Sequence, residues 1–426
     1  MRKFFAVTFL SVFMVGCSSV SPFYEFYAHR HVVPMLGKDY VEIPDDEPQV
    51  QHLSVKSYSG AAETALAMLA THRSNINSPG ISAAVAIDGQ LVWAGASGWA
   101  DIAQDKPMST RSLFRIGSTS KALNASLLAR MVDAGSIDLD TPISDYQIGK
   151  LNPAWQNITP RHLASHTAGI PHYNQNDDWR GMVRIISLDT HYENVADSVS
   201  LFDSSETLFA PGENFEYSSL GTVLLSAVMQ EAANKPYQQL MQTQVLNPLD
   251  LQYTLPEPSV ELRETQTPDL VTFYWHPDYD ERRVAEWREV DLSHRLAGGG
   301  FISTSSDLVR LGIGFNSSEF ISPRTREQFW TPQALNNGEV NEQNYALGWR
   351  VRESDFGKDI GTLFHANHGG VSRGAQSWLM VIPQYNMAVA VNINAKTDDF
   401  WEFAKVSYDL VKLFLRHRNK LMNEME

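Results

Sequence analysis

The sequence predicts an α/β (α+β) fold in which helices flank one antiparallel sheet built from both ends of the chain. Near the N-terminus, two apolar runs, 81–87 and 91–96, join through Asp88-Gly89, a dipeptide typical of hairpin turns. Two more strand-like runs, 376–383 and 387–393, lie near the C-terminus. Because helical patterns lie between these pairs, we expect one sheet and a helix-rich insert at about 150–290.

The helices of this fold have recognisable start and stop signals. An amphipathic helix is expected at about 61–73. The next begins near Ser118, and Gly135 can end it. A third follows Thr159, a capping residue, and a last amphipathic helix covers about 399–415.

Size and charge exclude several classes of protein. The chain has 426 residues, of which 43% are hydrophobic and 19% charged, a balance typical of folded domains rather than disordered chains. Its formal net charge is −15. Because phosphate binding needs a basic surface, we expect no nucleic-acid partner.

The N-terminus has the layout of an export signal. Arg2 and Lys3 precede an apolar run, 4–15, which is too short to cross a bilayer as a helix. Cys17, the single cysteine, follows at a small-residue cleavage point. The motif resembles a bacterial lipobox, although a signal anchor, or a cleaved signal with an incidental cysteine, also fits.

This motif implies three parts of the chain. We expect a signal peptide at 1–16, a lipid-anchored tether at 17–55 and the folded body at 56–426. Ser18 stands where an aspartate is associated with inner-membrane retention, so an outer-membrane lipoprotein of a bacterial cell envelope, facing the periplasm, is favoured. The oligomeric state is not predicted.

Ser118 and Lys121 form the most informative pair of the chain. Three positions apart on a helix, a hydroxyl and an amine share one face. A buried amine loses its charge more readily and can take the proton of the hydroxyl. Lys121 is the only lysine with a serine three positions before it. The same tetrad also fits an N-capping serine and a solvated lysine.

Two later segments carry compatible chemistry. Tyr217 could act as general base or proton shuttle if neighbouring cations lowered its pKa, although it also fits an ordinary turn tyrosine. His368-Gly369-Gly370 directly precedes a predicted strand. The amide of Val371, which follows these glycines, could donate to an oxyanion. The alternative is a glycine turn with an exposed histidine.

Together these motifs resemble those of the serine β-lactamase and penicillin-binding protein superfamily, in particular its class C β-lactamase-like serine hydrolases. Ser118-x-x-Lys121, Tyr217-Ser218-Ser219 and His368-Gly369-Gly370 occur in the family order. Similar flanking segments extend the resemblance over about 60–395, and lie at 163–171, 297–304 and 345–349. The pattern looks closest to the mitochondrial β-lactamase-like serine proteases. It implies the β-lactamase/transpeptidase-like fold.

The resemblance also implies a role for each motif residue. Ser118 would be the acyl-forming nucleophile, and Lys121 and Tyr217 would share general-base and general-acid duty. No cofactor or metal is implied. On the substrate side, Ser219 would hydrogen-bond in place of the family's asparagine, and His368 would orient the substrate or Tyr217. The main-chain amides of Ser118 and Val371 would form the oxyanion hole, with Gly370 beside it.

Two departures from the family pattern bear on substrate. Ser219 offers no amide to a substrate side chain, and His368 replaces a permanently charged lysine. Both disfavour efficient β-lactam hydrolysis, and His368→Lys is predicted to raise β-lactam acylation modestly. We therefore expect a membrane-anchored serine hydrolase acting on a small ester or peptide through an acyl-serine. A β-lactamase or D,D-peptidase-type penicillin-binding enzyme, and a non-catalytic peptidoglycan- or protein-binding pseudo-enzyme, remain the alternatives.

Two further patterns fit a structural role better than a functional one. Ser372 lies in a Gly-x-Ser-x-Gly sequence at 370–374, but a strand rather than a helix is predicted after it, unlike a nucleophile elbow. His162 and His166 lie four apart on a predicted helix. With no acidic third ligand nearby, capping or core packing is favoured over zinc.

Overall fold

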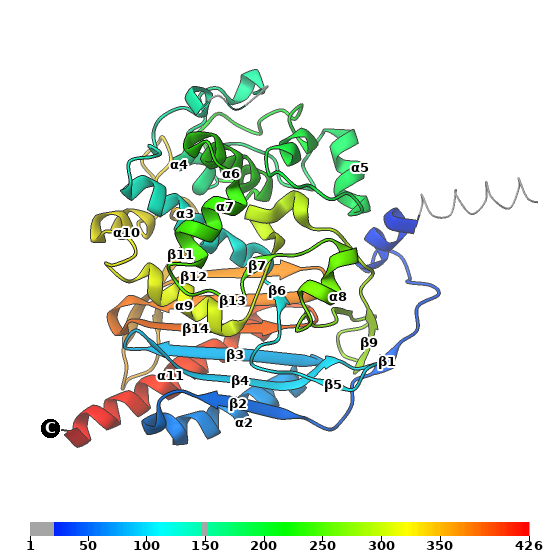
Figure 1. The fold of residues 1–426 in the computed structure, drawn as a ribbon, viewed down its shortest axis with the longest axis vertical. Helices are drawn as coiled ribbons and strands as arrows, with labels where there is room; N and C mark the ends of the chain where they lie inside the picture. Colours follow the sequence, from blue (N-terminus) through cyan, green and yellow to red (C-terminus); the bar gives the residue numbers. More distant parts are fainter. Residues whose placement is uncertain (1–20, 147, 149–150, 426) are drawn as a thin grey trace, which may run out of the picture.

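The two ends of the chain meet in an eight-stranded antiparallel sheet (Figure 1). A computed structural model describes residues 21–146, 148 and 151–425. The strand order is β11-β12-β13-β14-β3-β4-β2, with β5 paired to β4. β14 from the C-terminal end pairs with β3 from the N-terminal end, with Val389 opposite Val85. This confirms the predicted fold class. The strands are β2 (Gln49–Leu53), β3 (Gly80–Ile87), β4 (Gln90–Asp101), β5 (Lys106–Pro107), β11 (Arg350–Asp355), β12 (Thr362–Ser372), β13 (Ala375–Ile382) and β14 (Met387–Ile393).

Strand β3 shows why the sheet has helices on both faces. All eight of its residues are buried. Ala84 and Ala86 pack into one hydrophobic core, whereas Ala83 and Val85 pack into another. Successive side chains of a strand point to opposite faces, so β3 lies between two cores.

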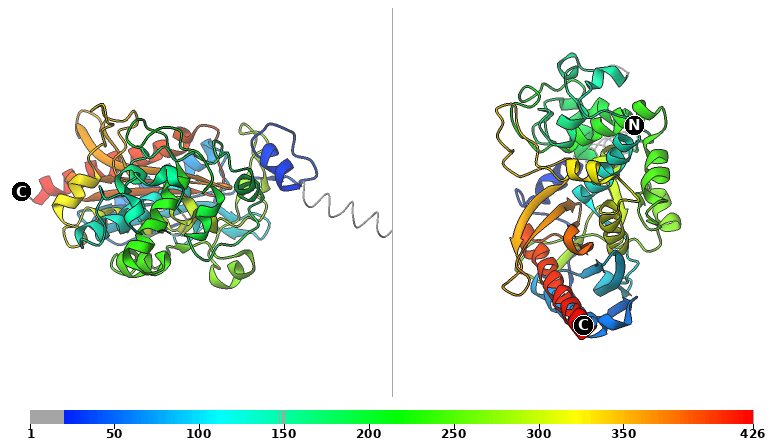
Figure 2. Two further views of the ribbon diagram at one scale, coloured as in Figure 1. Left: turned by 90° about the horizontal axis from the view of Figure 1, so that it is seen from above. Right: turned by 90° about the vertical axis from the view of Figure 1, so that its left-hand side faces the viewer.

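Helices supply the outer layers of both cores (Figure 2). The core that contains Ala83 and Val85 is completed by α2 (Ser59–Asn75) and α11 (Phe400–Met425), which pack together. The core of the other face is completed by α3 (Ser120–Asp133), α6 (Ser219–Ala233) and α9 (Ser305–Phe315). Among the described residues, no helix is long and apolar enough to cross a membrane.

The insert is helical mainly between residues 160 and 246. Its helices are α4 (Pro160–Ala164), α5 (Trp179–Ser187), α6, α7 (Tyr237–Met241) and the single turn α8 (Arg263–Gln266). Beyond the insert, α10 (Pro323–Phe329) follows α9. The rest of the insert supplies β7, β8 and β9 to two small sheets, β6-β10-β7 and β1-β9-β8, whose other strands come from outside the insert. Their strands are β1 (Val41–Glu42), β6 (Phe114–Arg115), β7 (Leu255–Pro256), β8 (Tyr274–Trp275), β9 (Arg283–Glu286) and β10 (Phe301–Ser303).

The predicted tether differs from an extended linker. Its described part contains a helical stretch over 21–28, and β1 pairs with β9. β2 joins the edge of the main sheet by pairing with β4. This pairing satisfies backbone groups that an edge strand would otherwise leave unpaired. The predicted signal peptide and Cys17 lie outside the described residues.

Three predicted boundaries also shift. Ser118 lies in a 3-10 turn, Gly117–Thr119, directly before α3 rather than inside it. The last helix is longer than expected and runs over 400–425. His368-Gly369-Gly370 lies within β12, not ahead of a strand, because its residues pair in register with β13.

Candidate active site

The amine of Lys121 contacts three oxygen atoms, one of which belongs to the Ser118 hydroxyl. Its Nζ donates to Gly298 O at 2.8 Å and to Ser219 Oγ at 2.9 Å, and lies 3.3 Å from Ser118 Oγ. The side chain is 2% exposed. Lys121 is therefore a buried group and not the solvated lysine of the alternative interpretation.

The surroundings of Lys121 favour its neutral form. Burial, and then Arg350 and Arg295, hold the pKa of its amine well below the ordinary value. A neutral amine has two N–H groups and one lone pair. If Gly298 and Ser219 accept the two N–H groups, the lone pair is left for the Ser118 hydroxyl. This is the arrangement of a base and its nucleophile.

Tyr217 lies on the other side of Ser118, in the loop that leads into α6. Burial raises its pKa, although Arg350 and hydrogen bonds with Ser118 and Ser219 act in the opposite direction. The guanidinium of Arg350 lies 5.2 Å from the centroid of the tyrosine ring. The expected cation is thus present, but burial outweighs it, and a lowered tyrosine pKa is not found. The phenol stays protonated and can donate.

Two glycines bring β12 against the turn that carries Ser118. A Cβ at Gly370 would lie 1.9 Å from Ile116 O and 2.9 Å from the amide nitrogen of Ser118. Gly117 has φ +51°, and a Cβ there would lie 2.9 Å from Val371 N. Only glycines permit this approach. It places the backbone of Ser118 beside that of Val371, as an oxyanion hole made of these two amides requires.

His368 faces away from the cavity. Its side chain is fully buried, its Nε2 lies 2.9 Å from the Tyr345 hydroxyl, and its Nδ1 lies 2.8 Å from Gly369 O. Burial, Arg350 and Lys121 hold its pKa well below the ordinary value. The histidine is therefore neither exposed nor placed to touch substrate directly, since residues 367, 369 and 371 line the cavity instead.

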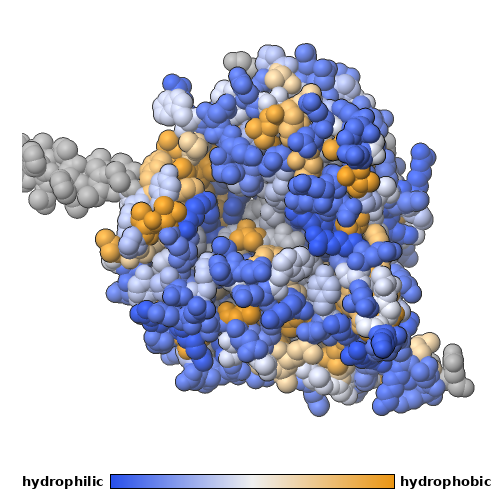
Figure 3. All heavy atoms as spheres, turned by 180° about the vertical axis from the view of Figure 1, so that it is seen from behind, coloured by the Kyte–Doolittle hydropathy of each residue, from blue (hydrophilic) through white to orange (hydrophobic). Residues whose placement is uncertain are grey.

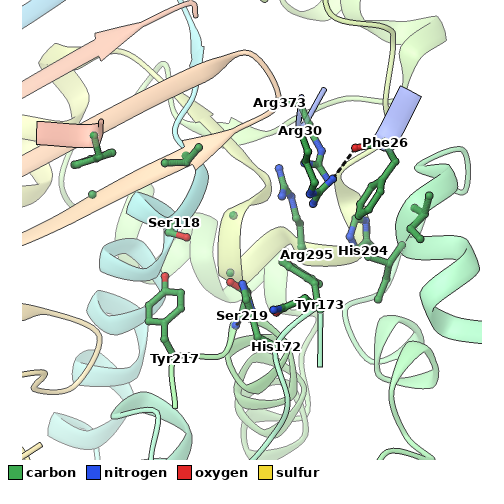
Figure 4. A pocket seen from close by; sticks show the side chains of 18 of the residues that line it. Phe26, Arg30, Ser118, His172, Tyr173, Tyr217, Ser219, His294, Arg295 and Arg373 are labelled. Atoms are coloured by element: carbon green, nitrogen blue, oxygen red, sulfur yellow. Dashed lines mark hydrogen bonds between the residues drawn. The ribbon is translucent and has the colours of Figure 1, made fainter. Parts of the chain in front are cut away.

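A cavity of about 790 Å³ opens beside Ser118 (Figure 4). Figure 3 shows a mostly hydrophilic surface that is hollowed between the helical part and the sheet. The part of the lining that the structure describes has no aspartate or glutamate but five arginines. The sequence analysis missed them all, because no local pattern links residues so far apart: Arg30, Arg295, Arg350, Arg352 and Arg373.

A family comparison agrees with this geometry. The profile of the protein family described as "Beta-lactamase" matches residues 67–409. The chain belongs to the β-lactamase family. This family of serine hydrolases includes β-lactamases and D-alanyl-D-alanine carboxypeptidases.

Individual relatives support the same placement. The mouse protein "Serine beta-lactamase-like protein LACTB, mitochondrial" is 26% identical over 428 aligned positions, which cover 80% of this chain and 76% of the mouse protein. The D-alanyl-D-alanine-carboxypeptidase/endopeptidase AmpH of Escherichia coli K12 is 28% identical, over 49% of this chain and 50% of AmpH. The D-amino acid amidase from Ochrobactrum anthropi SV3 shares the fold, with a TM-score of 0.66 and 19% identity over 84% of this chain and 99% of the amidase.

Two histidines that the sequence analysis did not assign to the site support its central loop. His166 Nδ1 accepts from the Ser218 amide at 3.3 Å, and His172 Nδ1 accepts from the Ser219 amide at 3.2 Å. Burial lowers the pKa of both rings, that of His172 to about 4. Neutral rings can accept these bonds, and they fix the loop between Tyr217 and Ser219.

The Gly-x-Ser-x-Gly sequence around Ser372 and the histidine pattern at His162 have structural explanations. His162 forms a capping box with Thr159, which confirms capping for this residue. Among the described residues, no cluster of three potential metal ligands is found. Ser372 is buried and accepts from Arg295 at 2.8 Å, and its chain turns directly into β13. It therefore lacks the strand-to-helix context of a nucleophile elbow.

Proposed function

We propose that this chain is a membrane-anchored serine hydrolase that cleaves an ester or a peptide/amide bond through an acyl-serine intermediate. The observation that carries the proposal is the contact between Ser118 and a buried Lys121 whose pKa is lowered. A buried lysine without this task would be costly, because burial opposes its charge.

The residues divide the reaction as follows. Ser118 Oγ attacks the substrate carbonyl while its proton passes to Lys121 Nζ, and the amides of Ser118 and Val371 stabilise the oxyanion. As the bond to the leaving group breaks, Tyr217 donates its proton to that group and regains one from Lys121. Water then attacks the acyl-serine while one of its protons passes to Lys121 Nζ, and Lys121 transfers that proton to Ser118 Oγ as the acid is released.

Covalent labelling with a fluorophosphonate tests this assignment. We expect the wild-type protein to be labelled and to hydrolyse a chromogenic short-chain ester, and Ser118→Ala to lose both. Ser372→Ala is the matched control, because it removes a hydroxyl that contacts Arg295 of the cavity lining and that the assignment does not use. If Ser372→Ala lost the label and Ser118→Ala kept it, the assignment would be contradicted. A wild-type protein with neither labelling nor turnover would instead support the non-catalytic alternative.

A second candidate, a β-lactamase or D,D-peptidase-type penicillin-binding enzyme, is favoured by Arg350. This cation lies beside Tyr217 and could attract a substrate carboxylate on the leaving-group side. Ser219 argues against it, because its hydroxyl is engaged by Lys121 and it has no amide. We expect kcat/KM for a p-nitrophenyl ester to exceed that for nitrocefin. The reverse order would favour the second candidate.

For location, we propose an outer-membrane lipoprotein of a bacterial cell envelope, acylated at Cys17 and facing the periplasm. The apolar run before the cysteine and its small-residue cleavage point support this.

A further inference from the structure

Three arginines form a cluster at one end of the cavity. Arg30 belongs to the N-terminal segment, Arg295 precedes the glycine turn at 298–300, and Arg373 lies in the turn between β12 and β13. None of the three forms an ion pair with an acidic side chain in the part of the chain that the structure describes. Other arginines nearby are paired: Arg115 and Arg263 with Glu257, and Arg288 with Glu25.

The cluster contains unused hydrogen-bonding capacity. Arg295 is 8% exposed, and its Nε is buried without a partner, although its Nη2 donates to Ser372 Oγ. Arg30 donates to the main-chain oxygen of Phe26 at 3.0 Å and covers the Phe26 ring. Burial, and then Arg295 and Arg30, lower the pKa of Arg373 to about 9. Arg30 is exposed, but it adds to the charge around Arg295 and Arg373, and three neighbouring cations with no acidic partner among the described residues indicate a site for an anion.

The course of β12 along the cavity indicates which part of a bound substrate would lie at the cluster of Arg30, Arg295 and Arg373. Arg350, beside Tyr217, pairs in register with Asn367 near the middle of the strand. Arg373 lies just beyond the far end of β12, about 20 Å further along at 3.3 Å per residue. Val371, with its oxyanion-hole amide, lies between. Figure 4 likewise shows Arg30, Arg295 and Arg373 grouped away from Tyr217.

Because Tyr217 donates to the leaving group, that group must occupy the Tyr217 end. The acyl part of the substrate then extends toward Arg373. Apolar side chains of α5, Ile185 and Ile186, also line the cavity, and Ile186 lines a smaller pocket together with Arg30 and Arg373. Such a lining beside the arginines suits an aliphatic stretch next to the anionic group of the substrate.

We propose that Arg30, Arg295 and Arg373 bind a carboxylate or phosphate group at the end of the substrate's acyl portion. This inference rests on the proposed hydrolase function and specifies its substrate class as esters or amides with an anionic acyl end. A guanidinium matches both oxyacids through two parallel N–H donors, so several such groups can replace the water around the anion.

Matched esters test the proposal. The probes are the mono-p-nitrophenyl esters of adipic and suberic acid, compared with p-nitrophenyl hexanoate and octanoate, which have the same chain lengths without the charge. A phosphonate-ended octanoyl ester distinguishes phosphate from carboxylate recognition. We expect kcat/KM to favour one anionic series over the neutral esters by about tenfold or more. Equal or better turnover of the neutral esters would overturn the proposal.

Variants locate the effect. Arg373→Gln and Arg30→Gln should each lower kcat/KM for the anionic esters by about tenfold, mainly through KM, and leave the neutral esters within about twofold. Arg111→Gln is the matched control for net charge, since its side chain is 66% exposed and lies outside the cavity lining. An equal loss on both series would show a structural effect of the arginines and contradict anion binding.

A binding measurement separates this proposal from the proposed function. Calorimetric titration of Ser118→Ala with the suberic and the phosphonate-ended monoesters needs no turnover. Binding that Arg373→Gln abolishes would support the anion site even if the wild-type protein hydrolysed no ester. Absence of binding by both anionic esters, together with normal hydrolysis of neutral esters, would overturn the anion site and leave the hydrolase proposal intact.

Discussion

The amine of Lys121 lies 3.3 Å from the hydroxyl of Ser118, and the main-chain carbonyl of Gly298 holds the same amine at 2.8 Å. A carbonyl oxygen can only accept, so it fixes the direction of one N–H group of Lys121. The arrangement orients the amine toward the serine without help from a carboxylate.

Replacing Lys121 by methionine should stop acylation of Ser118. Methionine keeps the length and apolar body of the side chain but removes the base. General-base catalysis is typically worth about 100- to 10,000-fold, so we expect a loss of that order in the fluorophosphonate labelling rate and in ester hydrolysis. Unfolding in urea would check that the variant is folded. A folded variant with near wild-type labelling would contradict the role of Lys121.

The pH dependence of hydrolysis should report the pKa of Lys121. Because the neutral amine is the base, kcat/KM should rise with pH as Lys121 loses its proton. Arg350 is among the groups that lower this pKa. In Arg350→Gln the pKa should rise, so the ascending limb should move to higher pH. A limb that stays in place or moves to lower pH would contradict this electrostatic assignment. Arg111→Gln serves as the control for the change in net charge.

Gly370→Ala should damage both stability and activity. The added methyl group would lie 1.9 Å from Ile116 O, so β12 or the Ser118 turn would have to move. Overpacking typically costs about 1–3 kcal/mol, and the displaced amides would weaken the oxyanion hole. Urea unfolding and ester kinetics measure the two effects.

Gly60→Ala is the control for this glycine substitution. A Cβ there meets nothing within 4 Å, and the residue lies in the first turn of α2. We expect unchanged activity and a free energy of unfolding that is equal or higher by up to about 1 kcal/mol. Wild-type behaviour of Gly370→Ala in both assays would contradict the close approach.

His368→Lys should not improve the capture of β-lactams. The sequence alone suggests a modest gain, because the family's lysine is charged. In the structure, however, position 368 is fully buried beside Arg350 and Lys121. An unpaired ammonium there should lower the free energy of unfolding by about 3 kcal/mol or more. Urea unfolding and acylation by nitrocefin measure the outcome. A stable variant with faster acylation would restore the original expectation.

The sequence predicts what is encoded locally. Ser118 and Lys121 lie one turn apart, so their contact follows from helical spacing, and the hairpin of β3 and β4 follows from Asp88-Gly89. The face to which His368 points depends on the register of β12 against β13, and a His-Gly-Gly sequence, which is typical of a turn, does not reveal that register.

Features that depend on distant pairing were also missed. β2 has four exposed residues among five, so its own pattern gives little sign of the partner strand β4. The cavity arginines come from four separate parts of the chain, and only the fold shows that Arg30 and Arg373 share a site with Ser118. Their sign of function is a shared cavity in which, among the described residues, none of them forms an ion pair with an acidic side chain, and no sequence pattern displays this.

Cys17→Ser should release the protein from the membrane. Cys17 is the single cysteine of the chain, so a thioether-linked lipid has no other attachment point. The variant should lose incorporation of radiolabelled palmitate and move from the membrane to the soluble periplasmic fraction. Hydrolysis of a soluble ester should persist, because the residues around Ser118 are unchanged. Ser19→Ala, two positions further along, is the control and should remain lipidated. Membrane fractionation and lipid labelling that did not change in Cys17→Ser would exclude a lipid anchor at this residue, and would favour an uncleaved signal anchor.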